Sequence, residues 1–197
     1  MTTPLEAWAL AALQSLPVFH EDVGSPDKPA QLMMVAQAVT EAAREQTGWP
    51  LSKQMLIAAE ITIFQHESNG SLRIHRNECN LKKRECDAGK AISSFQLHAV
   101  ALSKPEVWPK LGFMTFESTK LSAKEAARVL VRMYKYCETT GLPSDRIAMA
   151  FVGYAGRGCK LDGKWQGWRA RVATYSRLLR VPVPQEATPN DSQKPAG

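Results

Sequence analysis

The chain has 197 residues, of which 44% are hydrophobic and 22% charged, and this suits one globular domain with a hydrophobic core. Its net charge of +6 favours a polyanionic partner, whether nucleic acid, an anionic membrane or an anionic cell-wall polymer, and does not choose among them. No apolar stretch approaches the roughly 20 residues of a membrane-spanning helix, which argues against an integral membrane protein.

Three helices are expected in the first third of the chain. The first covers residues 4–16, with its apolar side chains on one stripe, and Pro17 ends it. No Lys or Arg precedes its apolar patch, so we expect a helix of the domain rather than a secretory signal peptide. The second helix covers residues 30–46. The third begins after Ser52, a favourable N-cap, and reaches residue 68 through an apolar run that predicts a buried helix.

One long polar segment separates these helices from the rest. Residues 69–90 are polar and irregular, and we expect a loop there with a small hairpin near residues 72–75. The elements expected after it are a short helix within residues 91–103, a loop at 105–121, a helix at 122–139 opened by a capping box, and helices at 144–155 and 166–179. The sequence thus predicts a mainly α domain of six to seven helices over residues 1–180, with a disordered Pro-rich tail at 181–197.

Four cysteines allow three pairings. Cys79 and Cys86 lie close together in the polar segment, so we predict one disulfide between them and a second between Cys137 and Cys159. Disulfides are typical of a protein that works outside a reducing cytosol. A zinc site is the alternative, although no C-x-x-C motif occurs, and four free buried thiols also remain open.

Glu67 stands where the third helix is expected to end, because Asn69 and Gly70 both tolerate a left-handed C-terminal cap. A helix C-terminus carries partial negative charge, and apolar neighbours would desolvate the side chain. Both effects favour the protonated carboxyl, which a general acid must hold near neutral pH. The alternative is a solvated glutamate on a frayed last turn.

Further carboxylates follow in the polar segment at Glu78, Glu85 and Asp87. A pair of carboxylates is the equipment for cleaving a glycosidic bond, because one protonates the leaving oxygen while the other activates water or acts as the nucleophile. Glu60 lies two helical turns before Glu67 on nearly the same face. We interpret Glu60 as a structural residue, because it is in the middle of the helix.

Three short motifs occur in order along the chain: Glu67-Ser68, then Ala91-x-Ser93-Ser94-Phe95-Gln96, then Ala150-x-x-x-Tyr154-Ala155-Gly156. Together they resemble the lysozyme-like lytic transglycosylases of the soluble and goose types, whose pattern is Glu-Ser, Gly-Ala-x-Gly-Leu-Met-Gln and Ala-Tyr-Asn-x-Gly. The matched region covers residues 51–158. Departures from the family pattern occur at Ser93, Ser94-Phe95 and Ala155, and none of them replaces the carboxylate.

The resemblance implies an α+β lysozyme-like fold and cleavage of the β-1,4 bond between N-acetylmuramic acid and N-acetylglucosamine in peptidoglycan. Glu67 would protonate the glycosidic oxygen and, in a transglycosylase, would then act as base on the muramoyl 6-hydroxyl to form a 1,6-anhydro sugar. An inverting hydrolase would need a second carboxyl about 6.5–9.5 Å away, for which Asp87 is the first candidate and Glu78 the second. The implied substrate-binding residues are Ser68, Glu78, Ser93, Gln96 and Tyr154.

This hypothesis needs no metal or organic cofactor, and its partner is bacterial peptidoglycan rather than nucleic acid. We expect a monomer that acts in the periplasm, outside the cell or after delivery by a virion, as an endolysin or virion lysin does. Two alternatives stay open. A catalytically inactive relative that binds glycan or serves as a structural module is supported by the altered second and third motifs. A helical nucleic-acid-binding protein is supported by the net charge alone.

Overall fold

A computed structural model describes residues 3–80, 82, 85–137, 143–156, 159 and 167–184. Within these residues the chain is mainly helical, as the sequence predicts. Six helices have eleven residues or more: α1 (Pro4–Gln14), α2 (Lys28–Glu45), α3 (Lys53–Ser68), α6 (Phe116–Tyr136), α7 (Pro143–Tyr154) and α8 (Gly167–Leu178). The shorter elements are η1 (His20–Asp22), α4 (Leu72–His75), α5 (Glu85–Gly89), β1 (Ala91–Ile92), β2 (Leu97–His98), η3 (Ala99–Ala101) and η4 (Pro105–Lys110). In this described part of the chain, no helix has the length and apolar character that crossing a bilayer requires.

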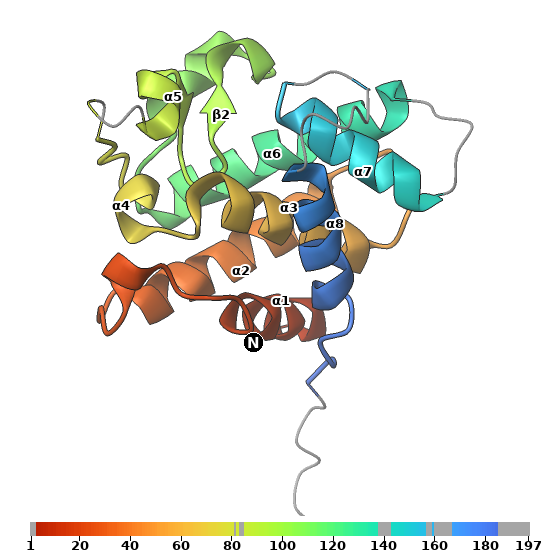
Figure 1. Cartoon of the computed structure of the whole chain (residues 1–197), viewed down its shortest axis with the longest axis horizontal. Helices are drawn as coiled ribbons and strands as arrows, with labels where there is room; N and C mark the ends of the chain where they lie inside the picture. The colour runs from red at the N-terminus through yellow and green to blue at the C-terminus, as the bar shows by residue number, and fades with distance from the viewer. Residues whose placement is uncertain are drawn as a thin grey trace, which may run out of the picture.

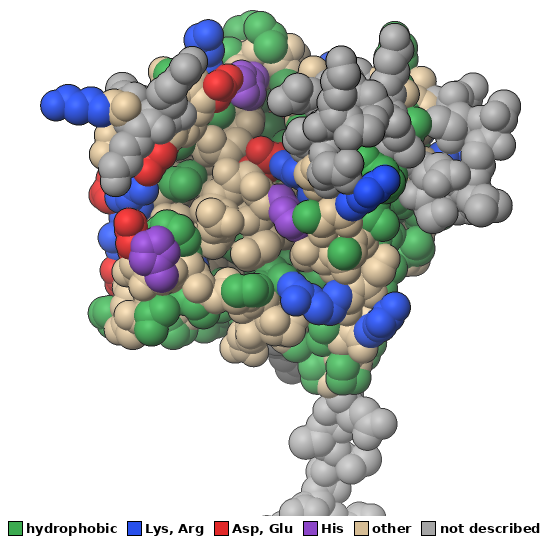
Figure 2. Space-filling model, viewed as in Figure 1, with side chains coloured by type: hydrophobic (Ala, Val, Ile, Leu, Met, Phe, Trp, Pro, Cys, Tyr) green, Lys and Arg blue, Asp and Glu red, His purple; other side chains and the backbone are tan. Residues whose placement is uncertain are grey.

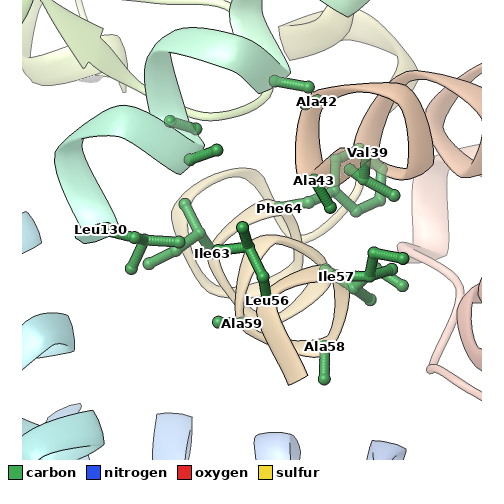
Figure 3. Packing of buried hydrophobic residues seen from close by; sticks show 14 of the residues in the cluster. Val39, Ala42, Ala43, Leu56, Ile57, Ala58, Ala59, Ile63, Phe64 and Leu130 are labelled. Atoms are coloured by element: carbon green, nitrogen blue, oxygen red, sulfur yellow. The ribbon is translucent and has the colours of Figure 1, made fainter. Parts of the chain in front are cut away.

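The central element is α3, which packs against α1, α2, α6 and α8 (Figure 1). Every residue from 56 to 64 is buried, so this helix is surrounded on all sides over more than two turns. Figure 3 shows Phe64 beside Val39 of α2 and Ile63 facing Leu130 of α6. The prediction of a buried third helix is confirmed, and its last turn is where the chain leaves the core.

The N-terminal helix α1 is part of this helical body. Trp8 is fully buried, and its indole Nε1 donates a hydrogen bond to the carbonyl of Val181 at 2.9 Å. Val181 opens the segment expected to be a disordered tail, so that segment begins with a residue held against α1. Residues 185–197, the rest of the expected tail, lie outside the described residues.

Two predictions for the segment between α3 and α6 are wrong. Residues 72–75 form the helical turn α4 rather than an extended hairpin arm, and residues 91–103 form two short strands and the three-residue η3 rather than one short helix. The small antiparallel sheet instead joins β1 to β2. Its register places Ala91 opposite His98 and Ile92 opposite Leu97. Ser93 and Gln96 have φ values of 67° and 48°, which turn the chain back between the strands and are incompatible with a right-handed helix.

The long helix α6 begins at Phe116, six residues before the predicted start at Ser122. The side chain of Thr115 caps it. Glu125 would have closed the predicted capping box, but its carboxylate instead accepts hydrogen bonds from the backbone N and the Oγ of Ser103, at 2.8 and 2.5 Å. The capping-box prediction is wrong because Glu125 binds a distant loop rather than its own helix start. α7 and α8 begin and end within two residues of their predicted bounds.

Both predicted disulfides are present. Cys79 is bonded to Cys86, which closes a short loop in the polar segment, and Cys137 at the end of α6 is bonded to Cys159. All four sulfurs are therefore joined in pairs, which removes the zinc-site and free-thiol alternatives.

Candidate active site

A cavity of about 760 Å³ opens beside the C-terminal end of α3. We call it the Glu67 cavity. Its walls come from the end of α3, from the segment α5 to η3, from one face of α6 and from the end of α7. Figure 2 shows acidic and histidine side chains at several separate places on this face, with Lys and Arg side chains among them. The polar residues that line it are Glu67, Asp87, Gln96, His98, Arg132 and Tyr154. A second cavity of about 510 Å³, at the start of α6, is lined by none of the predicted site residues.

Glu67 is the penultimate residue of α3, at the point where the helix emerges from the core. Asn69 is the C-cap with a φ of 53°, and Gly70 follows with a φ of 64°. The predicted left-handed cap is therefore confirmed. The side chain of Glu67 is 19% exposed and lines the cavity, so it does not project from a frayed turn into bulk solvent.

Arg171 of α8 binds the Glu67 carboxylate directly. Its Nη2 donates to Glu67 Oε1 at 2.5 Å, and the side chain of Arg171 is only 9% exposed. One residue before Glu67, His66 Nε2 is 2.9 Å from the hydroxyl of Thr174, also on α8. Two neighbouring contacts thus dock α8 on the last turn of α3. The sequence carried no signal for Arg171, because the pair joins residues 104 positions apart.

A buried polar network holds the chain immediately after Glu67. Lys28 Nζ donates to the carbonyl of Gly70 and to the carboxylate of Asp22, the latter at 3.0 Å. Gln31 accepts a hydrogen bond from Lys28 at 2.8 Å, and its amide is 3.0 Å from His75 Nδ1. Burial, together with the charges of Lys28 and Arg76, lowers the pKa of His75 to about 4, so the imidazole is neutral at pH 7. This network fixes the chain that follows the end of α3.

Asp87 stands on the wall formed by α5. Cys86, Asp87 and Ala88 all have left-handed φ values, from 50° to 56°, which is uncommon for residues other than glycine. The Cys79–Cys86 disulfide restrains the chain just before Asp87. Asp87 Oδ2 lies 3.7 Å from His98 Nε2 of β2. The structure therefore brings Asp87 to the same cavity as Glu67, and it adds His98 of β2 to the cavity wall.

Gln96 and Tyr154 complete the set of predicted residues at the cavity. Gln96 Nε2 donates to the carbonyl of Ser93 at 2.9 Å, across the turn between β1 and β2. The hydroxyl of Tyr154 donates to the carbonyl of Phe95 at 2.7 Å, which ties the end of α7 to that turn. Burial, and then the negative charge of Glu67, raises the pKa of Tyr154 well above its usual value, so its hydroxyl remains a donor.

Three predicted substrate-binding residues do not line the cavity. Ser68 is buried, and its Oγ donates to the carbonyl of Phe64 at 2.7 Å inside α3. Ser93 is buried in the β1–β2 turn, where its Oγ accepts a hydrogen bond from Phe95 N at 3.3 Å. Glu78 is exposed outside the cavity. Ser68 and Ser93 therefore shape the backbone around the cavity, and Asp87 is the better placed of the two candidates for a second acid.

Glu60 lies two turns below Glu67 in the same helix. It is fully buried, and neither of its carboxyl oxygens has a hydrogen-bond partner among the described residues. Burial raises the pKa of Glu60 well above its usual value. Glu60 is a buried acid beneath the cavity rather than a residue open to a ligand.

No group of three or more His, Cys, Asp or Glu side chains suited to a metal ion occurs among the residues that the structure describes. What the cavity does offer is one ion-paired carboxylate, a second carboxylate beside a histidine, an amide, a phenol and an arginine. Groups of these kinds can exchange protons and can form hydrogen bonds with hydroxyl, amide and carboxylate groups. No family model, curated protein or solved structure matches this chain.

Proposed function

We propose that this protein cleaves the glycan strands of bacterial peptidoglycan at the β-1,4 bond between N-acetylmuramic acid and N-acetylglucosamine, with Glu67 as general acid and base. One observation carries the proposal. The functional side chains of three motifs far apart in the sequence, Glu67, Gln96 and Tyr154, line a single cavity. A cavity of about 760 Å³ is within the range that ligand sites occupy.

The proposed chemistry begins with proton transfer from Glu67 to the glycosidic oxygen. Arg171 Nη2 lies 2.5 Å from Glu67 Oε1, so the guanidinium is in position to stabilise the carboxylate that the transfer leaves behind. Glu67 then removes a proton from the muramoyl 6-hydroxyl in a transglycosylase, or from water in a hydrolase.

Asp87 is the proposed second acid if the enzyme is a hydrolase. It lines the same cavity from a different wall, and His98 lies beside it. A carboxylate in that position is suited to directing water at the face of the sugar opposite the acid. Gln96 and the Tyr154 hydroxyl are proposed to contact the sugar or its acetamido group. No cofactor enters this scheme.

The two disulfides and the positive net charge agree with the proposal. Two disulfides are typical of proteins in an oxidising environment, which includes the bacterial periplasm and the cell exterior where peptidoglycan lies. A net charge of +6 favours association with an anionic wall.

A catalytically inactive glycan-binding module is the second candidate. The Glu67–Arg171 ion pair favours it, because a carboxylate neutralised by a buried arginine is not a proton donor. The two candidates differ in one outcome: an enzyme releases soluble fragments from the wall, whereas a binding module is retained on the wall and releases none.

The test is incubation of purified cell walls with the wild-type protein, Glu67→Gln and the control Glu106→Gln. Glu106 is an exposed glutamate on η4, away from the cavity. We expect turbidity to fall with the wild type and the control and to persist with Glu67→Gln. Mass spectrometry of the fragments then identifies the reaction, because anhydro ends are lighter than reducing ends by one water. Lysis by Glu67→Gln at the wild-type rate would contradict the proposal.

A further inference from the structure

One arginine of the Glu67 cavity has no acidic partner among the described residues. Arg132, in the second half of α6, lines the cavity and is exposed. Within the part of the chain that the structure describes, its guanidinium makes no ion pair or hydrogen bond. The neighbouring cations differ: Arg171 binds Glu67, and Arg128, one turn earlier on α6, binds Glu125 at 3.0 Å and the carbonyl of Ala101.

The position of Arg132 is set by rigid packing. The helix α6 packs along α2 and α7, and Val129, three residues before Arg132, is buried and lines the same cavity. α7 lies close to α6 at Gly153, where an added Cβ would come within 2.6 Å of Met133 Sδ. Tyr154, at the end of α7, lines the same cavity as Arg132.

An exposed arginine in a glycan cavity indicates an acidic group on the glycan. The sugar rings of peptidoglycan are neutral, and the acidic groups are the carboxylates carried by the muramoyl unit. A guanidinium binds a carboxylate through two parallel hydrogen bonds, which supplies both attraction and orientation. We propose that Arg132 binds a carboxylate of the muramoyl substituent and thereby selects muramic acid-containing glycans over uncharged ones. This inference rests on the proposed function.

Two sources can supply this carboxylate. In strands that have lost their peptides, the lactyl group of muramic acid ends in a free carboxylate. In strands that keep their peptides, the lactyl carboxyl forms the amide bond to the peptide, and the free carboxylates belong to the peptide. Binding to both has the same chemistry, and the substrates below distinguish them.

The experiment compares the wild type with Arg132→Met, Arg132→Lys and the control Arg180→Met, which changes an exposed arginine after α8 and outside the cavity. Each is assayed on peptide-bearing walls, on walls stripped of peptides by an amidase, and on walls whose carboxyls have been converted to amides. We expect Arg132→Met to raise KM by about tenfold on carboxylate-bearing walls, with kcat nearly unchanged. Arg132→Lys restores part of the loss, and Arg180→Met matches the wild type.

On amidated walls, the wild type and Arg132→Met should have the same KM. A loss confined to peptide-bearing walls assigns the carboxylate to the peptide, and a loss confined to stripped walls assigns it to the lactyl group. The inference would be overturned if Arg132→Met had the same KM as the wild type on both carboxylate-bearing walls. It would also be overturned if Arg132→Met raised KM equally on the amidated walls.

If the proposed function is wrong, the wild-type protein releases no soluble fragments from any of the three walls. The amount of each variant that stays bound to the same walls then tests whether Arg132 binds a carboxylate. Weaker retention of Arg132→Met on carboxylate-bearing walls supports the inference without catalysis, and equal retention refutes it.

Discussion

Two glutamates on one helix face have opposite surroundings. Glu60 and Glu67 lie seven residues apart in α3, and Glu60 is 0% exposed with no hydrogen-bond partner among the described residues. Glu67 lines the cavity and is bound by Arg171. The two side chains have the same chemistry, so position along the helix decides what each can do. Where α3 is enclosed by other helices, a carboxyl is inaccessible, and where α3 leaves the core, the same group lines a cavity.

Replacing the accessible glutamate should have the largest effect. Glu67→Gln removes the proposed proton donor and keeps the shape of the side chain, so we expect lytic activity to fall by about 10²–10⁴-fold, the usual contribution of a general acid or base. The matched variant in the core, Glu60→Gln, should stay close to the wild type. Rates of turbidity loss for both variants, with circular dichroism to verify the fold, check this pair. A larger loss with Glu60→Gln would reverse the roles assigned to the two residues.

Removing the cation that binds Glu67 should loosen the hold on this side chain. Arg171→Met loses the ion pair, so Glu67 is no longer held in one orientation at the cavity, and we expect lytic activity to fall by about tenfold. Arg171→Lys keeps a positive charge and should lose less activity. Rates of turbidity loss for the wild type and both variants measure this effect. Equal rates for all three proteins would show that Arg171 does not orient Glu67.

The buried glutamate should affect stability rather than activity. Burial raises the pKa of Glu60 in the folded chain above the value of about 4.3 expected in the unfolded chain. Above that pH the folded state binds more protons than the unfolded state, so the free energy of unfolding decreases as the pH rises. Glu60→Met removes this penalty and should be more stable than the wild type by about 1–3 kcal/mol at pH 7, with a smaller gain at pH 4.

Thermal or urea unfolding at pH 4 and pH 7 measures this difference, and Glu60→Gln is the control. The amide is neutral at every pH but keeps an unpaired polar group, so its gain at pH 7 should be smaller than that of Glu60→Met. A stability difference between Glu60→Met and the wild type that is the same at both pH values would show that Glu60 does not titrate in this range.

The smallest effect is expected at Gly70, in the turn that follows Glu67. Gly70 has a φ of 64°, and an added Cβ would lie 3.0 Å from the ring of Phe64. Gly70→Ala should therefore cost about 1 kcal/mol of stability and should lower activity only slightly, by tilting the last turn of α3. Gly24→Ala, at an open position with a φ of 77°, has the same backbone strain without the contact. Equal destabilisation by both variants would assign the cost to backbone strain alone.

The helices and the helix end were predictable from the sequence because their signals are local. Apolar spacing located α1, α2 and α3, and Asn69-Gly70 marked the end that carries Glu67. The disulfide pairs followed from closeness in the sequence. The structure of the polar segment was harder to predict. α4 and the β1–β2 turn are short, and the sequence around Ser93 and Gln96 does not indicate that these residues adopt left-handed φ values.

The sequence by itself therefore determined a mainly helical chain, its disulfides and an acid at the end of a buried helix. Only the tertiary structure decided which groups surround that acid. Arg171 comes from a helix 104 residues away, Arg132 and His98 come from other walls, and Ser68, Glu78 and Ser93 are excluded from the cavity. The physical reason is the range of the interactions. Helix propensity and capping act over a few residues, whereas an ion pair across packed helices depends on how the whole core is assembled.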